Sequence, residues 1–388
     1  MARHFAANFV NLLILAMVVL GGVVYWAKSQ FEGTGPLAEN TCIEVPRGDT
    51  ISRLADRLAD QGVISNASVF RVGARYQELG SKLRFGNYEV PAGASQEDVL
   101  KIVTSGGNAG FNFIVTYRVG IQTASFAVSE RTEDGVKRLG VVDVDGGKEA
   151  IQELTGGTGC VTLRVTVAEG ATSWQVQNAL NQAYFLVPTD APIPQEGMLS
   201  PNTYDVPRGE PVDAIIARMF NAQKRILAEE WDNRQDGIPI TSPEDALILA
   251  SIIEKETGVT EEKPEVASVF VNRLNKGMKL QMDSTVEYGL TEGEGFLGRG
   301  LRRSELSKKT PYNTYLIEGL PPGPIGNPGR DAIRATLNPN TSNFLFFVAD
   351  GTGGHAFAET LVEHNRNVAA WRKIEADRKR QRQNGNGG

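Results

Sequence analysis

The chain has 388 residues, with 40 Lys and Arg against 46 Asp and Glu side chains, for a formal net charge of −6. Hydrophobic residues make up 41%, which excludes a disordered polyampholyte, and the mild acidity gives no basic face for a nucleic-acid backbone. The sequence contains no HExxH, CxxC, GxSxG, SxxK or Walker A motif, which argues against a zinc enzyme and removes the common serine-acyl and P-loop classes.

The first predicted element is a membrane-spanning helix over residues 9–27. Asn11 is its only strongly polar residue, and about 20 apolar residues span a bilayer core. Tyr25 and Trp26 stand where an interfacial aromatic belt would lie. No small-residue cleavage site follows promptly, so the pattern favours an uncleaved signal anchor over a cleaved signal peptide.

Cys42 and Cys160 are the only cysteines in the sequence. Each directly precedes a β-like run, so a disulfide between neighbouring strands is geometrically possible in an oxidising compartment. Two unrelated buried thiols are the alternative.

A turn of the form Val-x-x-Gly recurs between a β-like run and a segment of helical period. Glycine at its fourth position makes a positive φ inexpensive. Thr50 and Ser95 stand where helix N-caps are expected. In the first of these helices, the residues predicted to form one apolar face are Ile51, Leu54, Ala55 and Leu58. Such units suit the binding of extended polymers, or simply build α+β domains. The four turns are residues 45–48, 90–93, 167–170 and 206–209.

Residues 108–160 are β-rich, with strands separated by glycine and charged residues, and predict a small inserted sheet whose function the sequence does not reveal. From Arg372 the chain is charged and then rich in Gly and Asn. This tail is expected to begin as a solvated helix and to become disordered.

A helix is predicted to begin at Ser242, which with Asp245 resembles a capping box, and to end at Gly258. Glu256 falls on the apolar stripe of this helix, whereas Glu254 points about 200° away from it. The other stripe residues are Leu249, Ile252 and Ile253.

A carboxylate on an apolar stripe has its pKa raised by desolvation, which is what a general acid at neutral pH needs. Glu256 is therefore a candidate general acid. The alternative is a helix-end glutamate that extends to solvent or pairs with Lys255 or Lys263.

Downstream, residues 281–289 form another dense polar segment, and residues 312–315 and 319–329 form an irregular stretch rich in Tyr, Asn and Pro. A rigid loop with aromatic faces and amide groups suits a sugar-binding groove, because sugars present both apolar faces and hydroxyls. A proline-stiffened structural loop is the alternative. His355 and His364 are too few for a metal site.

Together these segments resemble the membrane-anchored endolytic murein transglycosylases, the YceG-like family. The resemblance covers nearly the whole chain except residues 108–160, which are not a usual family part, and the tail. The segments that carry it, besides the N-terminal anchor and a LysM-like unit around residues 41–107, are EGMLSPNTY (196–204), ASIIEKET (250–257), VASVFVNRL (266–274), QMDSTVEYGL (281–290), TPYNTYLIEGLPPGPIGNPG (310–329) and FFVADGTGGHAF (346–357).

The resemblance implies an α+β protein in the bacterial cytoplasmic (inner) membrane, with its catalytic part outside, in the periplasm. It implies peptidoglycan glycan strands as substrate, peptidoglycan synthases (penicillin-binding proteins) as partners, and no cofactor. The implied domains are a cytoplasmic N-terminus (1–8), a signal anchor (9–27), a LysM-like β/α domain (41–107), a β-rich insert (108–160), a mixed α/β catalytic domain (161–371) and a disordered charged tail (372–388).

By the same resemblance, the catalytic glutamate aligns with Glu256, and Glu254 is the second choice. Where the family usually has Asp-Pro-Thr, this chain has Ser284 in place of the proline, which puts the rigidity of that loop in doubt. The residues expected to bind substrate are Gln281, Asp283, Thr285, Tyr312, Asn313, Tyr315 and Asn327.

The implied reaction closes a 1,6-anhydro ring on N-acetylmuramic acid, with Glu256 as acid and then base. A retaining hydrolase needs a second carboxylate about 5–5.5 Å away. Asp283 is the candidate for it, which keeps a muramidase as a rival. A membrane-tethered peptidoglycan-binding scaffold is the non-enzymatic alternative.

Overall fold

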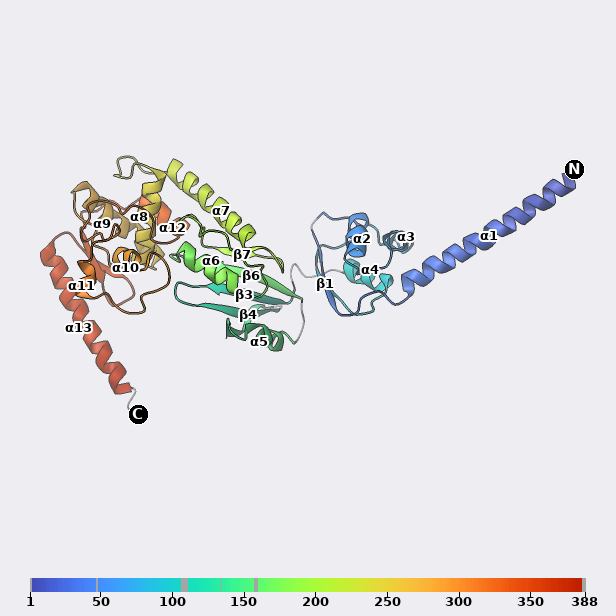
Figure 1. Cartoon of the computed structure of the whole chain (residues 1–388), viewed down its shortest axis with the longest axis horizontal. Helices are drawn as coiled ribbons and strands as arrows, with labels where there is room; N and C mark the ends of the chain where they lie inside the picture. Colours follow the sequence, from blue (N-terminus) through green and yellow to red (C-terminus); the bar gives the residue numbers. More distant parts are fainter. Residues whose placement is uncertain (1, 47, 106–110, 133, 157–159, 386–388) are drawn as a thin grey trace. The chain divides into compact units, whose positions relative to one another are not determined.

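The computed structural model describes residues 2–46, 48–105, 111–132, 134–156 and 160–385 (Figure 1). It contains both helices and sheets, as the expected α+β class requires. Contacts divide the chain into two compact units. The predicted boundary between residues 107 and 108 lies outside the described residues. The first unit is Met1–Val115, Ala127–Val142 and Gly146–Thr162, and the second is Thr116–Phe126, Asp143–Asp145 and Leu163–Gly388.

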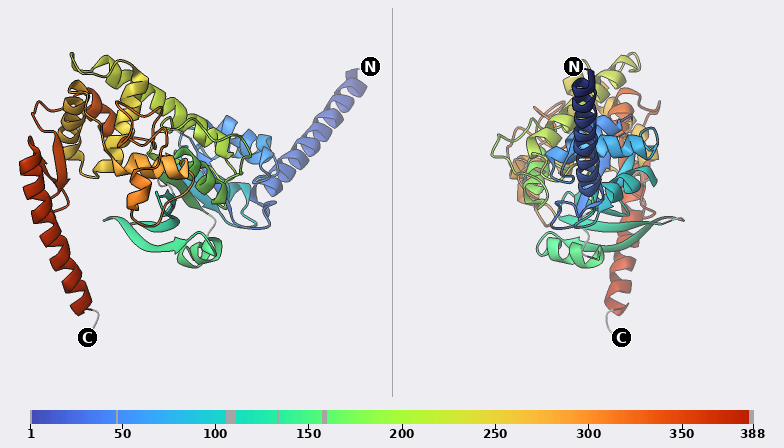
Figure 2. Two further views of the ribbon diagram at one scale, coloured as in Figure 1. Left: turned by 60° about the vertical axis from the view of Figure 1, so that its left-hand side comes forward. Right: turned by 90° about the vertical axis from the view of Figure 1, so that its right-hand side faces the viewer.

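The N-terminal helix α1 (Ala2–Glu32) is unbroken (Figure 2). Its stretch Leu12–Glu32 has a mean hydropathy of 1.9 over its most apolar 18-residue window, and no residue of that window is buried inside the protein. Phe31, near the end of the helix, is 8% exposed and packs into the core of the first unit. Among the described residues, α1 is the one helix that is long and apolar enough to cross a membrane. A signal sequence near the N-terminus has the same length and composition, so both alternatives fit this helix.

The rest of the first unit begins as strand, helix, helix, strand. These are β1 (Thr41–Val45), α2 (Ile51–Asp60), α3 (Ala67–Tyr76) and β2 (Gly86–Val90), followed by α4 (Gln96–Ser105). β1 and β2 pair antiparallel, with Thr41 opposite Val90. The helices cover this ribbon with apolar side chains, because a two-stranded ribbon alone is only marginally stable in water. The core residues with no exposed surface include Leu54, Leu58, Phe70, Val99 and Leu100.

The four turns predicted from Val-x-x-Gly are confirmed. Their glycines have φ of 76°, 71°, 78° and 80°, and the helices that follow are α2, α4, α6 (Ser173–Gln182) and α7 (Val212–Asp232). The oxygens of both expected caps accept backbone N–H bonds: Thr50 Oγ1 from Arg53 and Ser95 Oγ from Asp98. The predicted apolar face of α2 is buried in full.

The strands of residues 108–160 do not form a sheet of their own, contrary to expectation. β3 (Phe113–Val119), β4 (Ala124–Thr132) and β5 (Gly135–Asp143) share a five-stranded sheet with β6 (Val161–Val167) and β7 (Thr203–Asp205), in the order β5-β4-β3-β6-β7. The physical reason is that β3 carries buried side chains and needs hydrogen-bonded neighbours on both edges. The helix α5 (Gly147–Leu154) follows β5.

Cys42 of β1 and Cys160, just before β6, are joined by a disulfide with Cα atoms 5.4 Å apart. The two strands belong to different sheets, so the expectation of neighbouring strands was wrong. The bridge closes a loop of sequence separation 118. It therefore constrains a long stretch of the unfolded chain.

We expect the unfolded, unreduced protein to show no free thiol, and two after reduction. In the chain-entropy view, a loop of this length stabilises the fold by about 4–5 kcal/mol, so Cys42→Ser/Cys160→Ser is expected to lower the unfolding free energy by up to that amount. Thiol titration and urea unfolding measure both. Two free thiols before reduction would show that the bridge does not form.

The second unit is built around the helix α8 (Pro243–Glu256). The predicted cap is present, since Ser242 Oγ accepts a bond from the Asp245 N–H, and the helix ends where Thr257 becomes extended. α8 packs with α9 (Lys263–Asn275) and α12 (Arg330–Leu337), and their shared core includes Leu249, Ile252, Ile253, Phe270 and Ile333. The remaining elements are η1 (Thr260–Glu262), α10 (Asp283–Thr291), α11 (Arg303–Leu306), β8 (Phe346–Ala349), β9 (His355–Ala358) and α13 (Leu361–Gly385).

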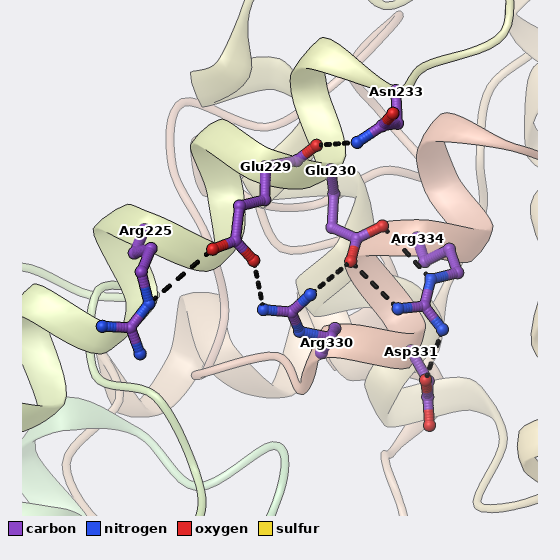
Figure 3. A network of polar contacts seen from close by, with 7 residues as sticks. All are labelled: Arg225, Glu229, Glu230, Asn233, Arg330, Asp331 and Arg334. Atoms are coloured by element: carbon purple, nitrogen blue, oxygen red, sulfur yellow. Dashed lines mark hydrogen bonds and ion pairs between the residues drawn. The ribbon is translucent and has the colours of Figure 1, made fainter.

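A polar network holds the start of α12 against α7 (Figure 3). Glu230 of α7 is 6% exposed and accepts hydrogen bonds from the guanidinium groups of Arg330 and Arg334. Glu229 pairs with Arg330 as well. Because Arg330 directly follows the long irregular stretch, this network fixes the end of that stretch.

The C-terminal tail begins as a helix, as expected. α13 continues as a helix to Gly385, through most of the segment expected to be disordered, and residues 386–388 lie outside the described residues (Figure 2).

Candidate active site

A cleft of about 520 Å³ opens in the second unit at the C-terminal end of α8. Four of the predicted site residues line it: Glu256, Gln281, Asp283 and Tyr315. The other lining residues come from α9, from the approach to α10, and from β8 and α13. They are Arg273, Met282, Phe346, Phe347, Val348, Leu361, His364 and Val368.

Glu256 is the last residue of α8, and its carboxylate accepts a 2.6 Å hydrogen bond at Oε1 from Ser284 Oγ. Burial raises the pKa of Glu256, and the nearby charge of Asp283 raises it further. The bond from Ser284 and the proximity of His355 act in the opposite direction, but the net pKa shift is upward. The carboxyl group therefore holds its proton to a higher pH than an exposed glutamate does.

Glu254 lies in a different environment, with only 3% of its side chain exposed. Its Oε1 accepts a 2.7 Å bond from Lys263 Nζ, and its Oε2 accepts the backbone N–H of Gly329. Lys263 is 2% exposed and also reaches Glu169. Burial would lower the pKa of Lys263, but the two carboxylates raise it, so the lysine stays charged. Lys263 thus pairs with Glu254 and not with Glu256.

Asp283 and Gln281 are exposed in the cleft at the start of α10. Asp283 Oδ1 accepts a 2.7 Å bond from the Tyr315 hydroxyl. Burial and the Asp283 carboxylate both raise the pKa of Tyr315, so the phenol remains a donor. This bond links the α10 residues to the irregular loop in which Tyr315 lies.

Three residues expected to bind substrate have no exposed surface, namely Thr285, Asn313 and Asn327. Their polar atoms serve the protein instead. Thr285 Oγ1 donates to the Met282 carbonyl, Asn313 Nδ2 donates to two loop carbonyls, and Asn327 binds main-chain groups of two other segments. In this structure the three side chains bond other parts of the protein, and none of them lines the cleft.

Tyr312 is also outside the cleft lining. Its ring lies 4.8 Å from that of Tyr288, centroid to centroid, in the core of the second unit. Tyr288 in turn donates to Glu196, whose pKa burial raises. The aromatic ring at position 312 therefore stiffens the loop.

Sequence reasoning missed the roles of Ser284 and Arg273. The sequence marks Ser284 only as the residue that stands where the family usually has proline. In the structure its hydroxyl donates a hydrogen bond to the Glu256 carboxylate. Arg273 is 5% exposed at the cleft wall. It donates to the carbonyls of Leu345 and Leu280, and its guanidinium lies over the ring of Phe346 at 5.4 Å. Its position in a regular helical segment gave no signal of these contacts.

Comparisons with known proteins show which sequences and structures the chain is similar to. The YceG-like family model matches residues 43–139 and 143–370. The endolytic murein transglycosylase of Bacillus subtilis (strain 168) is 29% identical over 90% of this chain and 90% of that protein. The protein of the same name from Streptococcus pneumoniae serotype 2 (strain D39 / NCTC 7466) is 25% identical over 94% of this chain and 65% of that protein.

Among solved structures, a crystal structure of a putative yceG-like protein from Listeria monocytogenes is 26% identical, with a TM-score of 0.46, over 84% of this chain and 98% of that chain. The family model includes most of residues 108–160, so the expectation that this segment is not a usual family part was wrong. Because the matched ranges cover far more than half of the sequence, the chain belongs to the YceG-like family.

Proposed function

We propose that this chain is an endolytic murein transglycosylase, which cuts the β-1,4 bond between N-acetylmuramic acid and N-acetylglucosamine within peptidoglycan strands. The observation that carries the proposal is the place of Glu256 at the wall of a cleft large enough for sugar rings, where burial raises its pKa. Burial raises the pKa of Glu254 as well, but Glu254 is paired with Lys263. The name and the extent of the Bacillus relative support the same activity.

In the proposed reaction, the protonated Glu256 gives its proton to the glycosidic oxygen as the bond from that oxygen to C1 of the muramic acid breaks. The C6 hydroxyl of the same sugar then forms a bond to C1 and gives its proton to the Glu256 carboxylate. The glutamate ends as it began, no water is consumed, and the product carries a 1,6-anhydro ring. One group acts as acid and then base, which requires a pKa near the working pH.

A muramidase is the second candidate, because Asp283 lines the same cleft as Glu256. A retaining hydrolase uses its second carboxylate as a nucleophile. Asp283 is already held by the Tyr315 hydroxyl at 2.7 Å, which stabilises its negative charge and lowers its nucleophilicity. That bond favours the transglycosylase, with Asp283 as a substrate-binding group beside Gln281.

The test is mass spectrometry of purified murein digested by the full chain in detergent, beside Asp283→Asn. We expect products lighter than hydrolysis products by one water molecule, and we expect Asp283→Asn still to form them at a reduced rate. Products with normal reducing ends that disappear in Asp283→Asn would instead identify a muramidase. No product from the wild-type chain would favour a binding scaffold.

We further propose that α1 anchors the protein in the bacterial cytoplasmic membrane with both units outside, where peptidoglycan synthases release nascent strands. The apolar length of Leu12–Glu32 supports the anchor. The strand–helix–helix–strand order over Thr41–Val90 supports a LysM-like, glycan-binding role for the first unit. Co-purification of the full chain with a penicillin-binding protein tests the partner. Cleavage of its C-terminus by protease added to spheroplasts tests the orientation, because a cytoplasmic C-terminus would be protected there.

Removal of the Ser284 hydroxyl has a predictable effect on the pH profile. Burial raises the pKa of Glu256, and the hydrogen bond from Ser284 partly offsets that rise. Ser284→Ala removes this bond, so the pKa of Glu256 is expected to be higher in the variant. A general acid loses activity as the pH rises through its pKa. We therefore expect the alkaline limb of kcat/KM to move to higher pH in Ser284→Ala.

The rate at which soluble muropeptides form, measured across a range of pH to give kcat/KM, shows this shift. Ser307→Ala removes an exposed serine hydroxyl that donates to the Ser304 carbonyl. It is the matched control and is expected to leave the profile unchanged. A limb that moves to lower pH would contradict the role of Ser284.

A further inference from the structure

A second cavity of about 270 Å³ lies in the second unit beside the active-site cleft. Its position follows from two pairs of consecutive residues. Glu256 lines the cleft and Lys255 the second cavity, both at the end of α8; Asp283 lines the cleft and Ser284 the second cavity, both at the start of α10. The hydrogen bond between Ser284 and Glu256 therefore joins a residue that lines the second cavity to one that lines the cleft.

Lys255 is a half-buried cation in this second cavity. Among the described residues, no hydrogen bond or ion pair is formed by its ammonium group. Its stem passes close to two glycines: a Cβ at Gly326 would lie 3.2 Å from Lys255 Cε, and one at Gly170 3.6 Å from its Cδ. The backbone thus leaves room for a lysine stem whose donors have no partner within the described chain.

Glu287 lines the same cavity and complements Lys255. Its Oε1 accepts the backbone N–H of Leu297, and within the described residues its Oε2 accepts no hydrogen bond. The cavity therefore offers a cationic donor and an anionic acceptor, and Phe296 and Ile121 add exposed apolar surface at 48% and 37%.

The charges around Lys255 select among ligands. Burial lowers the pKa of Lys255 below its ordinary value, and the carboxyl groups of Glu287, Glu196 and Glu254 oppose this shift only in part. Three carboxyl groups near one cation oppose the entry of a free carboxylate, such as those of a peptide stem. A neutral group with one acceptor and one donor meets no such repulsion.

We propose that this cavity is a subsite for an N-acetylated sugar, with the acetamido group held between Lys255 and Glu287. The acetamido C=O accepts from the ammonium, its N–H donates to the Glu287 carboxylate, and the methyl group and sugar face contact Phe296 and Ile121. The inference rests on the proposed function, since it places the sugars on either side of the cleaved bond in the two cavities, with Glu256 between them.

The experiment measures binding without turnover, by calorimetry, in the full chain carrying Glu256→Gln. The two probes are chitotetraose and cellotetraose, which share a β-1,4 backbone but differ in having an acetamido or a hydroxyl group at C2. We expect Lys255→Met to weaken chitotetraose binding by about 10- to 100-fold, as for the loss of a charged hydrogen bond, and to leave cellotetraose binding unchanged.

Glu287→Leu is a second, independent variant and is expected to weaken chitotetraose binding in the same selective way. Lys276→Met, at an exposed lysine at the end of α9, is the matched control and is expected to change neither affinity. Thermal unfolding of each variant verifies its fold.

The proposal is overturned if the Glu256→Gln chain does not bind chitotetraose, or if Lys255→Met leaves that affinity unchanged. Weakening by Lys255→Met only for peptide-bearing murein strands would identify a stem carboxylate as the ligand and also overturn it. These outcomes are distinct from failure of the proposed function, which is a wild-type chain that binds chitotetraose but forms no anhydro product from murein.

Discussion

Glu256→Gln is expected to lower the rate of glycan cleavage by about 10²- to 10⁴-fold, the contribution of a positioned acid–base group. The amide neither gives a proton to the glycosidic oxygen nor takes one from the C6 hydroxyl. It does keep an oxygen that accepts the bond from Ser284, so the cleft is expected to keep its shape. Release of soluble muropeptides from sacculi, resolved by mass spectrometry, measures the loss.

The same substitution is expected not to destabilise the protein at neutral pH. Burial raises the pKa of Glu256 in the folded state above its ordinary value of 4.5. The folded state therefore binds more protons than the unfolded state between those two pKa values, and stability falls as the pH rises across that window. Glutamine does not ionise, so above this window Glu256→Gln should unfold at the same or a higher temperature. Cleavage near the wild-type rate would remove Glu256 from the mechanism.

Helical periodicity was enough to place Glu256 and Glu254 on different sides of α8, but not to reveal their partners. Lys263 is close to both in sequence, and the alternative that it neutralises Glu256 was reasonable. The choice is made by tertiary structure, because α9 carries Lys263 to Glu254 at 2.7 Å and leaves Glu256 in the cleft. A partner on another helix leaves no periodic signal in sequence.

The irregular loop shows a second limit of sequence reasoning. Tyr, Asn and Pro predicted a rigid polar loop, and the loop is rigidly bonded, but residue type does not tell which amides face a groove. Asn313 and Asn327 satisfy buried main-chain groups, as irregular backbone requires. Tyr315, two residues after Asn313, does reach the cleft.

Local signals predicted local structure well and long-range pairing poorly. The turns at Gly48, Gly93, Gly170 and Gly209 have the positive φ that their sequence indicates. The pairing of β3 with β6 was missed, because strands of similar composition carry no mark of which neighbour they choose.

Glu254→Gln is expected to lower the unfolding free energy strongly and to leave the catalytic group in place, whereas Glu256→Gln is expected to remove most of the cleavage activity and leave stability intact. It removes the charge that pairs with Lys263, and both side chains are nearly fully buried, at 3% and 2% exposed. Breaking a buried pair from one side typically costs about 3–5 kcal/mol, because it leaves an uncompensated charge. Glu169 remains near Lys263, so the lower end of that range is expected. Urea unfolding of the full chain in detergent measures it.

The double variant Glu254→Gln/Lys263→Met separates a structural pair from a catalytic acid. With the cation also removed, no buried charge remains unpaired, and we expect part of the lost stability to return, as a coupling energy between the two sites. Glutamine at position 254 still accepts the N–H of Gly329 and so keeps the loop before α12 in place. Folded Glu254→Gln should therefore retain cleavage activity at low temperature. If it lost cleavage by about 10²-fold or more with its unfolding free energy unchanged, Glu254 would be the acid and Glu256 would not.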